Sequence, residues 1–93
     1  MAEHQSAIKA AKQGARRRLR NRSVRSVVKT RVRRAEFLIV SKELAEADAA
    51  VDLALRALDR AAKKGVIHPN NAALRKSRLM RKLNEARVTA SAN

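Results

Sequence analysis

Residues 42–65 have the sequence KELAEADAAVDLALRALDRAAKKG, and this stretch decides the fold class. Its apolar residues recur near every 3.5 positions, which is typical of a helix that packs along one face. These residues are Leu44, Ala47, Val51, Ala54, Leu58 and Ala61. Its acidic residues lie mostly off this seam, and Gly65 supplies the left-handed position that commonly ends a helix. The spacing predicts a bundle helix over residues 42–64 with an acidic outer face, which should lie against solvent or a basic neighbour.

Two further helices are predicted on either side of this one. The first covers about Ser6 to Ser41, and its second half carries apolar residues at three- and four-residue spacing: Val24, Val28, Val32, Ala35, Leu38 and Ile39. The third follows a short linker, is capped by Asn70, and has its own apolar face: Ala72, Leu79, Leu83 and Ala86. The single aromatic residue, Phe37, is expected in the core beside Leu38 and Ile39.

Short connections between three helices predict an all-α, antiparallel three-helix bundle. Before Arg22 the first helix has a weak apolar stripe surrounded by arginines, so this half should project from the bundle. We therefore predict a single domain over residues 1–93, with a projecting basic arm at 1–22 and a bundle at 23–93.

Charge is strongly segregated along the chain. The 93 residues include 23 Lys and Arg against 8 Asp and Glu, a formal net charge of +15. The basic residues concentrate in residues 1–34 and 60–93, whereas six of the acidic residues lie in 35–59. This pattern predicts one positive surface that attracts polyanions. The alternative is a disordered basic tail at each end.

The composition argues against several other classes of protein. Hydrophobic residues make up 45% of the chain, but 19 of them are alanine, so the core is small and stability should increase on binding a partner. The absence of cysteine agrees with a reducing compartment. The sequence has neither a secretory signal nor an apolar run long enough to span a membrane, so we expect a cytoplasmic protein; an organellar transit peptide is the alternative for its Arg-rich start.

Few residues suit catalysis or metal binding. The histidines are His4 and His68, and neither has a second ligand at useful helical spacing. A general base also needs a cleft that tunes its pKa, and this composition offers little to build one. We predict that the protein is not an enzyme and has no catalytic residues, metal site or cofactor. His68 is expected to contact phosphate or to cap the linker.

The basic segments favour nucleic acid as the ligand. Each Lys or Arg placed on a phosphate releases condensed counterions. One Phe and no Tyr or Trp argue against stacking on single-stranded bases, so backbone and shape recognition of structured RNA fits best. Three other interpretations remain. They are a DNA-packing protein, a helical adaptor for acidic proteins or anionic membranes, and a leucine-zipper DNA binder based on residues 70–78, which lacks the following leucine heptads.

Two stretches also resemble a known family. Residues 18–30, RLRNRSVRSVVKT, followed by Arg33 and Arg34, are similar to the amino-terminal signature of the bacterial small-subunit ribosomal protein S-twenty family. Residues 61–73, AAKKGVIHPNNAA, with 75–79 and Leu83-Asn84, are similar to its second signature, in the expected order. Leu74 stands where a basic residue is common in the family, and we expect it to extend the apolar face of the third helix.

The resemblance implies a structural component of the small ribosomal subunit that binds ribosomal RNA directly and supports assembly. The implied partners are the 5′ domain of the small-subunit RNA, the long helix near its 3′ end, and neighbouring ribosomal proteins, with the chain a monomer within the ribosome and no membrane contact. The RNA-binding candidates in the first signature region are Arg16, Arg17, Arg18, Arg20, Arg22, Ser23, Arg25, Ser26, Lys29, Arg33 and Arg34. Those in the second region are Lys63, Lys64, His68, Asn70, Asn71, Arg75, Lys76 and Arg78, with free amides near Asn70 available to a phosphate.

Overall fold

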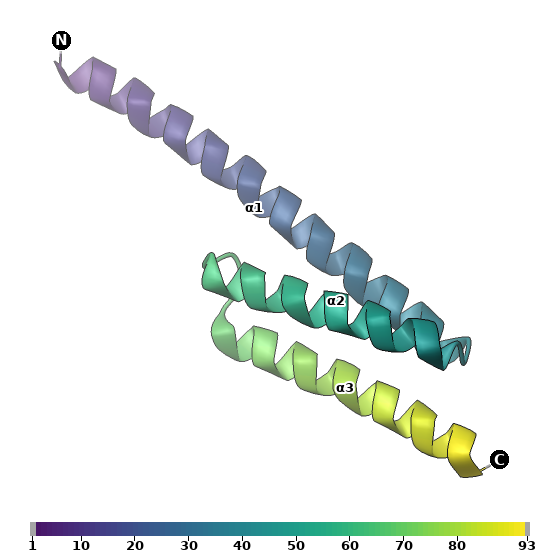
Figure 1. The fold of residues 1–93 in the computed structure, drawn as a ribbon. Coiled ribbons are helices and arrows are strands. Elements are labelled where there is room, and N and C mark those ends of the chain that lie inside the picture. The colour runs from purple at the N-terminus through teal and green to yellow at the C-terminus, as the bar shows by residue number, and fades with distance from the viewer. Residues whose placement is uncertain (1, 93) are drawn as a thin grey trace.

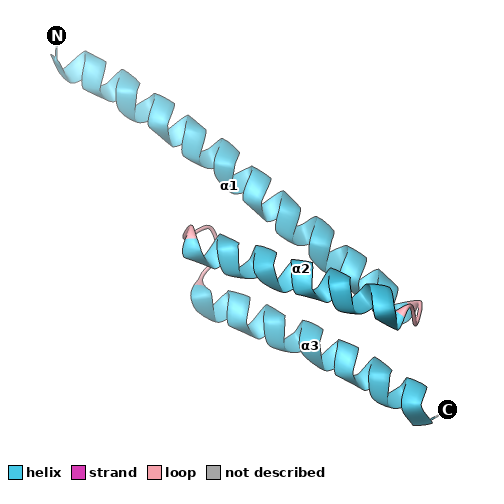
Figure 2. Ribbon diagram, in the orientation of Figure 1, coloured by secondary structure: helices cyan, strands magenta, loops and turns pink. Residues whose placement is uncertain are grey.

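The fold is an antiparallel arrangement of three helices, as the sequence predicts. The computed structural model describes residues 2–92, which form α1 (Ala2–Val40), α2 (Leu44–Lys63) and α3 (Pro69–Ala92). Figure 1 shows α2 running back along the C-terminal half of α1, and α3 running back along α2. Within residues 2–92 the remaining segments are two short turns and the structure contains no strand (Figure 2). The all-α fold class with an elongated first helix is therefore confirmed.

The molecule is elongated because α1 is much longer than its partners. It has 39 residues, against 20 in α2 and 24 in α3. The N-terminal half of α1 extends beyond both other helices (Figure 1), and the overall extents are 73 × 21 × 13 Å. The radius of gyration is 18.5 Å, whereas a compact domain of this length would have about 12 Å. Both basic segments are helical, so the alternative of two disordered tails is wrong for residues 2–92.

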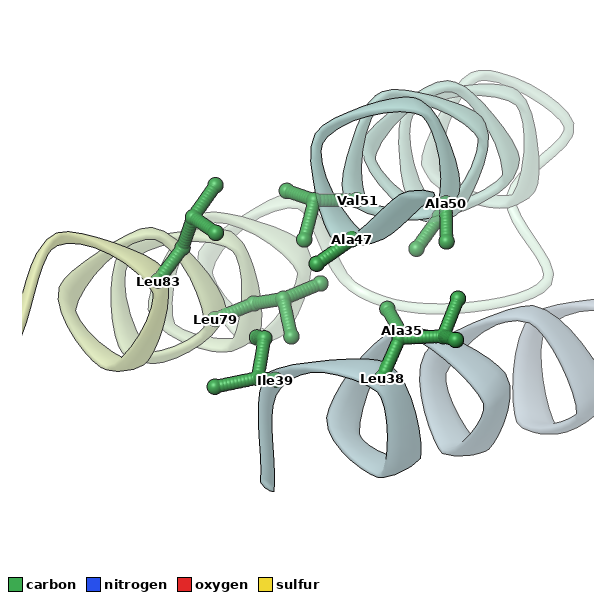
Figure 3. Close-up of a cluster of buried hydrophobic side chains, with 9 residues drawn as sticks. Ala35, Leu38, Ile39, Ala47, Ala50, Val51, Leu79 and Leu83 are labelled. Atoms are coloured by element: carbon green, nitrogen blue, oxygen red, sulfur yellow. The ribbon is translucent and has the colours of Figure 1, made fainter. Parts of the chain in front are cut away.

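The core forms where the three predicted seams meet. One cluster joins all three helices (Figure 3): Ala35, Leu38 and Ile39 of α1, Ala47, Ala50, Val51 and Ala54 of α2, and Leu79 and Leu83 of α3. A second cluster lies nearer the α2–α3 linker and consists of Val28, Ala57, Leu58, Ala61 and Val66. Because so many of these residues are alanine, the helices meet through small side chains and a few leucines. The seams predicted from spacing are confirmed.

Phe37 is not in the core, contrary to the prediction. Its exposed fraction is 66%. An α-helix turns by about 100° per residue, so Phe37 points about 200° away from buried Ala35, whereas Leu38 and Ile39 return to the buried side. The prediction was wrong because it relied on the two neighbouring core residues in the sequence and not on the angle of Phe37 around the helix.

Leu74 also departs from its predicted place. It is 48% exposed, and the buried residues of α3 are Ala72, Leu79 and Leu83. The burial of Leu79 and Leu83 inside the bundle also removes the leucines that a zipper would need on its surface, so the leucine-zipper interpretation is wrong.

The same backbone motif ends both α1 and α2. At the end of α1, the Lys42 N–H donates to the Ile39 carbonyl (3.1 Å) and the Glu43 N–H donates to the Leu38 carbonyl (3.0 Å). At the end of α2, the Gly65 N–H donates to Ala62 and the Val66 N–H donates to Ala61. These are paired Schellman hydrogen bonds, which require a left-handed residue just beyond the helix. Gly65 has φ 75° as predicted, but the equivalent residue after α1 is Lys42, with φ 61°.

These two positions predict opposite effects on stability. Lys42→Gly should raise the free energy of unfolding by about 1 kcal/mol, because glycine adopts positive φ without the steric cost of a Cβ. Gly65→Ala should lower it by a similar amount through backbone strain alone, since an added Cβ would meet no atom within 4 Å. Urea unfolding of both variants beside the parent protein measures the two changes. Equal midpoints for all three proteins would contradict the assignment of the motif.

The start of α3 is capped by a different residue from the one predicted. The His68 carbonyl accepts from the Ala72 N–H at 3.0 Å, and His68 Nδ1 accepts from the Asn70 N–H at 3.1 Å. His68 is therefore the N-terminal cap of α3, which agrees with one of its two predicted roles, that of capping the linker. Asn70 lies inside the helix. Pro69 occupies the first helical position, where its missing N–H costs no hydrogen bond.

Candidate nucleic-acid interface

Basic side chains form two rows along α1. Residues spaced by three and four share one side of a helix, and on this basis one row contains Arg18, Arg22, Arg25, Lys29 and Arg33. Arg25 Nη2 in this row donates to the carbonyl of Val66 in the α2–α3 linker at 3.5 Å, so we call it the linker-side row. The second row, the α2-side row, contains Arg16, Arg20, Arg31 and Arg34. The two rows lie on nearly opposite sides of α1, so the helix presents cations in two directions.

The cations of α1 are not neutralised within the bundle. The four ion pairs between side chains of residues 2–92 use Arg56, Lys76, Lys82 and Arg87, and none of these belongs to α1. All eleven residues that the sequence predicted on α1 as RNA contacts are exposed. The charge of α1 is therefore available to an external polyanion, which it would bind by releasing counterions.

The acidic face of α2 has a basic neighbour, and that neighbour is α3. Lys76 Nζ lies 2.8 Å from Asp59 Oδ1, and Arg87 pairs with Asp48. A third contact joins Lys82 Nζ to Glu36 Oε1 of α1 at 3.4 Å. All these side chains are partly exposed, so each pair adds little stability. Their effect is to offset much of the positive charge of α3 while leaving that of α1 intact.

The predicted residues of the second region lie around the linker and the first turns of α3. Lys63, Lys64, His68, Asn70, Asn71 and Arg78 are exposed, and Arg75 and Lys76 are partly buried. The hydrogen bond from Arg25 to Val66 joins two residues 41 positions apart, so the structure brings the two signature stretches together. Two of the predicted RNA contacts are less available than expected. Lys76 is paired with Asp59, and the backbone N–H of Asn70 already donates to His68 Nδ1.

Two functional candidates escaped the sequence analysis. Arg31 and Arg60 line one groove between α1 and α2, together with Lys64. Arg31 lies four residues before buried Ala35, at the edge of the packing seam, and it is not among the residues that the family resemblance supplied as RNA contacts. The available signal was the spacing of Arg60, which lies one helical turn before the predicted Lys64 and so shares its side of α2.

Other kinds of site find little support in the part of the chain that the structure describes. Residues 2–92 contain no group of three or more His, Cys, Asp or Glu side chains that could hold a metal ion. None of the three helices combines the length and the apolar character that crossing a bilayer requires. The main surface feature of these residues is therefore their exposed Lys and Arg side chains, most of which lie on α1.

These features define a class of protein. A small helical bundle whose longest helix exposes cations on two sides, and whose single aromatic residue is Phe37, has the features of structural proteins that bind polyanions through their backbone and shape.

The family follows from comparison with known proteins. Residues 2–84 match the family model described as Ribosomal protein S20. A protein of Dehalococcoides mccartyi named small ribosomal subunit protein bS20 is 46% identical over 86 residues, covering 92% of this chain and 98% of its own length. Proteins of the same name from Thermomicrobium roseum and Geobacillus thermodenitrificans are 46% and 42% identical over 84 and 89 residues, covering 90% and 96% of this chain and 85% and 100% of their own lengths. The chain belongs to the ribosomal protein S20 family, the S-twenty family that its two signature stretches resemble.

Proposed function

We propose that this protein is a structural, non-enzymatic component of the small ribosomal subunit that binds directly to small-subunit ribosomal RNA and supports subunit assembly. Membership of the S20 family supports this role. The observation that carries RNA binding is the exposure of the basic side chains along α1, none of which pairs with an acidic side chain within residues 2–92. In a bacterium the protein would act in the cytoplasm, as a monomer within the ribosome and beside other ribosomal proteins.

The proposal also assigns different roles to the two parts of the chain. Residues 1–22 act as a basic arm and residues 23–93 as the bundle that positions it, with Met1 and Asn93 lying outside the described residues. Residues 3–20 are exposed apart from partly buried Gly14, and none of them belongs to either buried cluster, which supports the assignment of the arm to an external ligand. The RNA partners are the 5′ domain and the long helix near the 3′ end, which the two opposite rows of α1 could contact from different sides.

A salt-titrated binding assay tests the function. The purified protein is titrated into the folded 5′ domain of small-subunit ribosomal RNA, with an unrelated structured RNA and duplex DNA as competitors. We expect selective binding to the 5′ domain that persists at physiological salt, because affinity for polyanions in general falls steeply as salt rises.

The same assay separates the proposed function from its nearest competitor. Equal affinity for the 5′ domain, the unrelated RNA and the DNA would contradict recognition of ribosomal RNA. The protein would then bind through charge alone, as a DNA-packing protein does.

A further inference from the structure

We propose that the groove between α1 and α2 is a binding site for one sugar–phosphate strand of RNA, held by Arg31, Arg60 and Lys64. This inference rests on the proposed function and adds two residues to it, since Arg31 and Arg60 belong to neither set of contacts predicted from the signatures, whereas Lys64 belongs to the second set. It is an arrangement that the fold creates: Arg31 lies on α1, whereas Arg60 and Lys64, which are 29 and 33 positions further along the chain, lie in the last turn of α2 and at its C-terminal cap.

The walls of the groove suit a backbone strand. Its volume is about 280 Å³, and its lining combines the three cations with Ser23, Val24, Val27 and Ala57. Ala57 is buried at its base, whereas Val27 is 43% exposed. Arg31 and Arg60 approach from opposite helices, so two guanidinium groups can hydrogen-bond one phosphate from both sides. The small and aliphatic side chains in the same lining leave room for the ribose, and the Ser23 hydroxyl among them can hydrogen-bond a ribose 2′-hydroxyl.

The charge of the groove is complementary to phosphate. No carboxylate lines it, and Arg31, Arg60 and Lys64 take no part in the ion pairs found within residues 2–92. Towards the start of α2 the groove continues into a second hollow that shares Arg31 and adds Arg34. The lining of that hollow includes one acidic residue, Glu46. The lining is therefore most basic around Arg31, Arg60 and Lys64 and becomes less basic toward Glu46.

The groove is also continuous with the arm. Arg16, Arg20, Ser23, Val27 and Arg31 are spaced by four, three, four and four residues, so they share one side of α1. A strand that follows Arg16 and Arg20 along the arm would enter the groove at Ser23 without changing side. The α2-side row of the arm and the groove thus form one track for a single RNA strand.

Charge-neutral variants test the site in the intact protein. We expect Arg31→Gln and Arg60→Gln each to lower affinity for the folded 5′ domain of small-subunit ribosomal RNA by about tenfold. Each should also make the slope of log affinity against log salt shallower by about 0.7 to 0.9, the change for one lost phosphate contact. The control is Arg81→Gln, which removes the same charge from the exposed outer face of α3 and should leave the slope unchanged.

Two additional variants test whether a loss of affinity arises from the groove itself. Arg60→Lys keeps the charge and should restore the slope while recovering part of the affinity, because lysine lacks the two-pronged geometry of arginine. Val27→Glu places a carboxylate in the groove at a half-exposed position and should weaken binding more than either neutral variant. Circular dichroism melting curves check that each protein is folded.

The outcomes distinguish this inference from the function on which it rests. If the parent protein binds the 5′ domain selectively but Arg31→Gln and Arg60→Gln behave like Arg81→Gln, the groove site is wrong and the proposed function stands. If the parent protein shows no preference for the 5′ domain over duplex DNA, the proposed function is wrong and the groove is not an RNA site.

Discussion

Replacing Leu58 by alanine is expected to lower the free energy of unfolding by about 3 to 5 kcal/mol. Leu58 is 0% exposed and belongs to the cluster with Val28, Ala57, Ala61 and Val66. Most of its neighbours are small and fixed in helices, so they cannot move in to fill the cavity that the substitution leaves. Proteins of this length have a total stability of about 5 to 14 kcal/mol, so the variant should lose a large part of it.

Thermal unfolding followed by circular dichroism measures this effect. The melting temperature of Leu58→Ala should fall by about 12 °C or more. Leu74→Ala is the matched control, because it removes the same atoms from a side chain that is 48% exposed and should change stability by less than about 0.5 kcal/mol. Similar melting temperatures for the two variants would show that the cluster around Leu58 does not hold the bundle together.

The largest expected effect on RNA binding comes from the linker-side row of α1. Replacing all five of its cations by glutamine should make the slope of log affinity against log salt shallower by about 3.5 to 4.5, and should lower affinity at physiological salt by about 10³- to 10⁴-fold. The physical reason is that these side chains are exposed and form no ion pair within residues 2–92, so their full charge is available to phosphates. Filter binding or fluorescence anisotropy over a salt series gives both quantities.

A second five-residue variant removes the same charge from elsewhere on the molecule. It carries glutamine at Lys42, Arg56, Arg81, Lys82 and Arg87. Three of these cations already pair with acidic side chains. The control variant should therefore lose much less affinity than the linker-side variant. Equal losses would mean that net charge, and not its placement on α1, governs binding.

The sequence was a good guide to the helices and their packed faces. Residues at three- and four-residue spacing, such as Val51, Leu58, Leu79 and Leu83, are all buried as predicted. Spacing succeeds here because each helix has one apolar face and few residues that compete with it. Gly65 marked the end of α2 because glycine is the ordinary residue at positive φ.

The predictions that failed concerned the backbone conformation of single residues and their positions around a helix, which the residue types do not specify. Lys42 adopts the left-handed conformation after α1, although lysine gives no local signal for it. Phe37 was assigned by its neighbours in sequence, and its angle around the helix places it outside. The cap at α3 is His68 because Pro69 already begins the helix, so Asn70 lies two residues beyond the cap position.

The sequence was sufficient to predict that the candidate interface is basic, but not how its charged residues are arranged in space. The basic residues of α1 could be named from the sequence, yet the sequence does not show which cations meet a carboxylate in three dimensions. Folding places Lys76 beside Asp59 and leaves Arg22 and Lys29 free of acidic partners within residues 2–92. The groove with Arg31 and Arg60 required knowing how α1 and α2 pack, and no motif encodes that contact.

The order of the helices also determines how quickly this bundle can form. α2 packs on α1 and α3 packs on α2, whereas α1 and α3 share the smallest contact, so most tertiary contacts link neighbouring elements of the chain. Bundles dominated by such local contacts fold within microseconds to milliseconds. Synthesis adds only about 5 to 20 residues per second, so each helix can dock on its predecessor soon after it leaves the exit tunnel. A newly made chain would then be able to meet its RNA without waiting for a slow folding step.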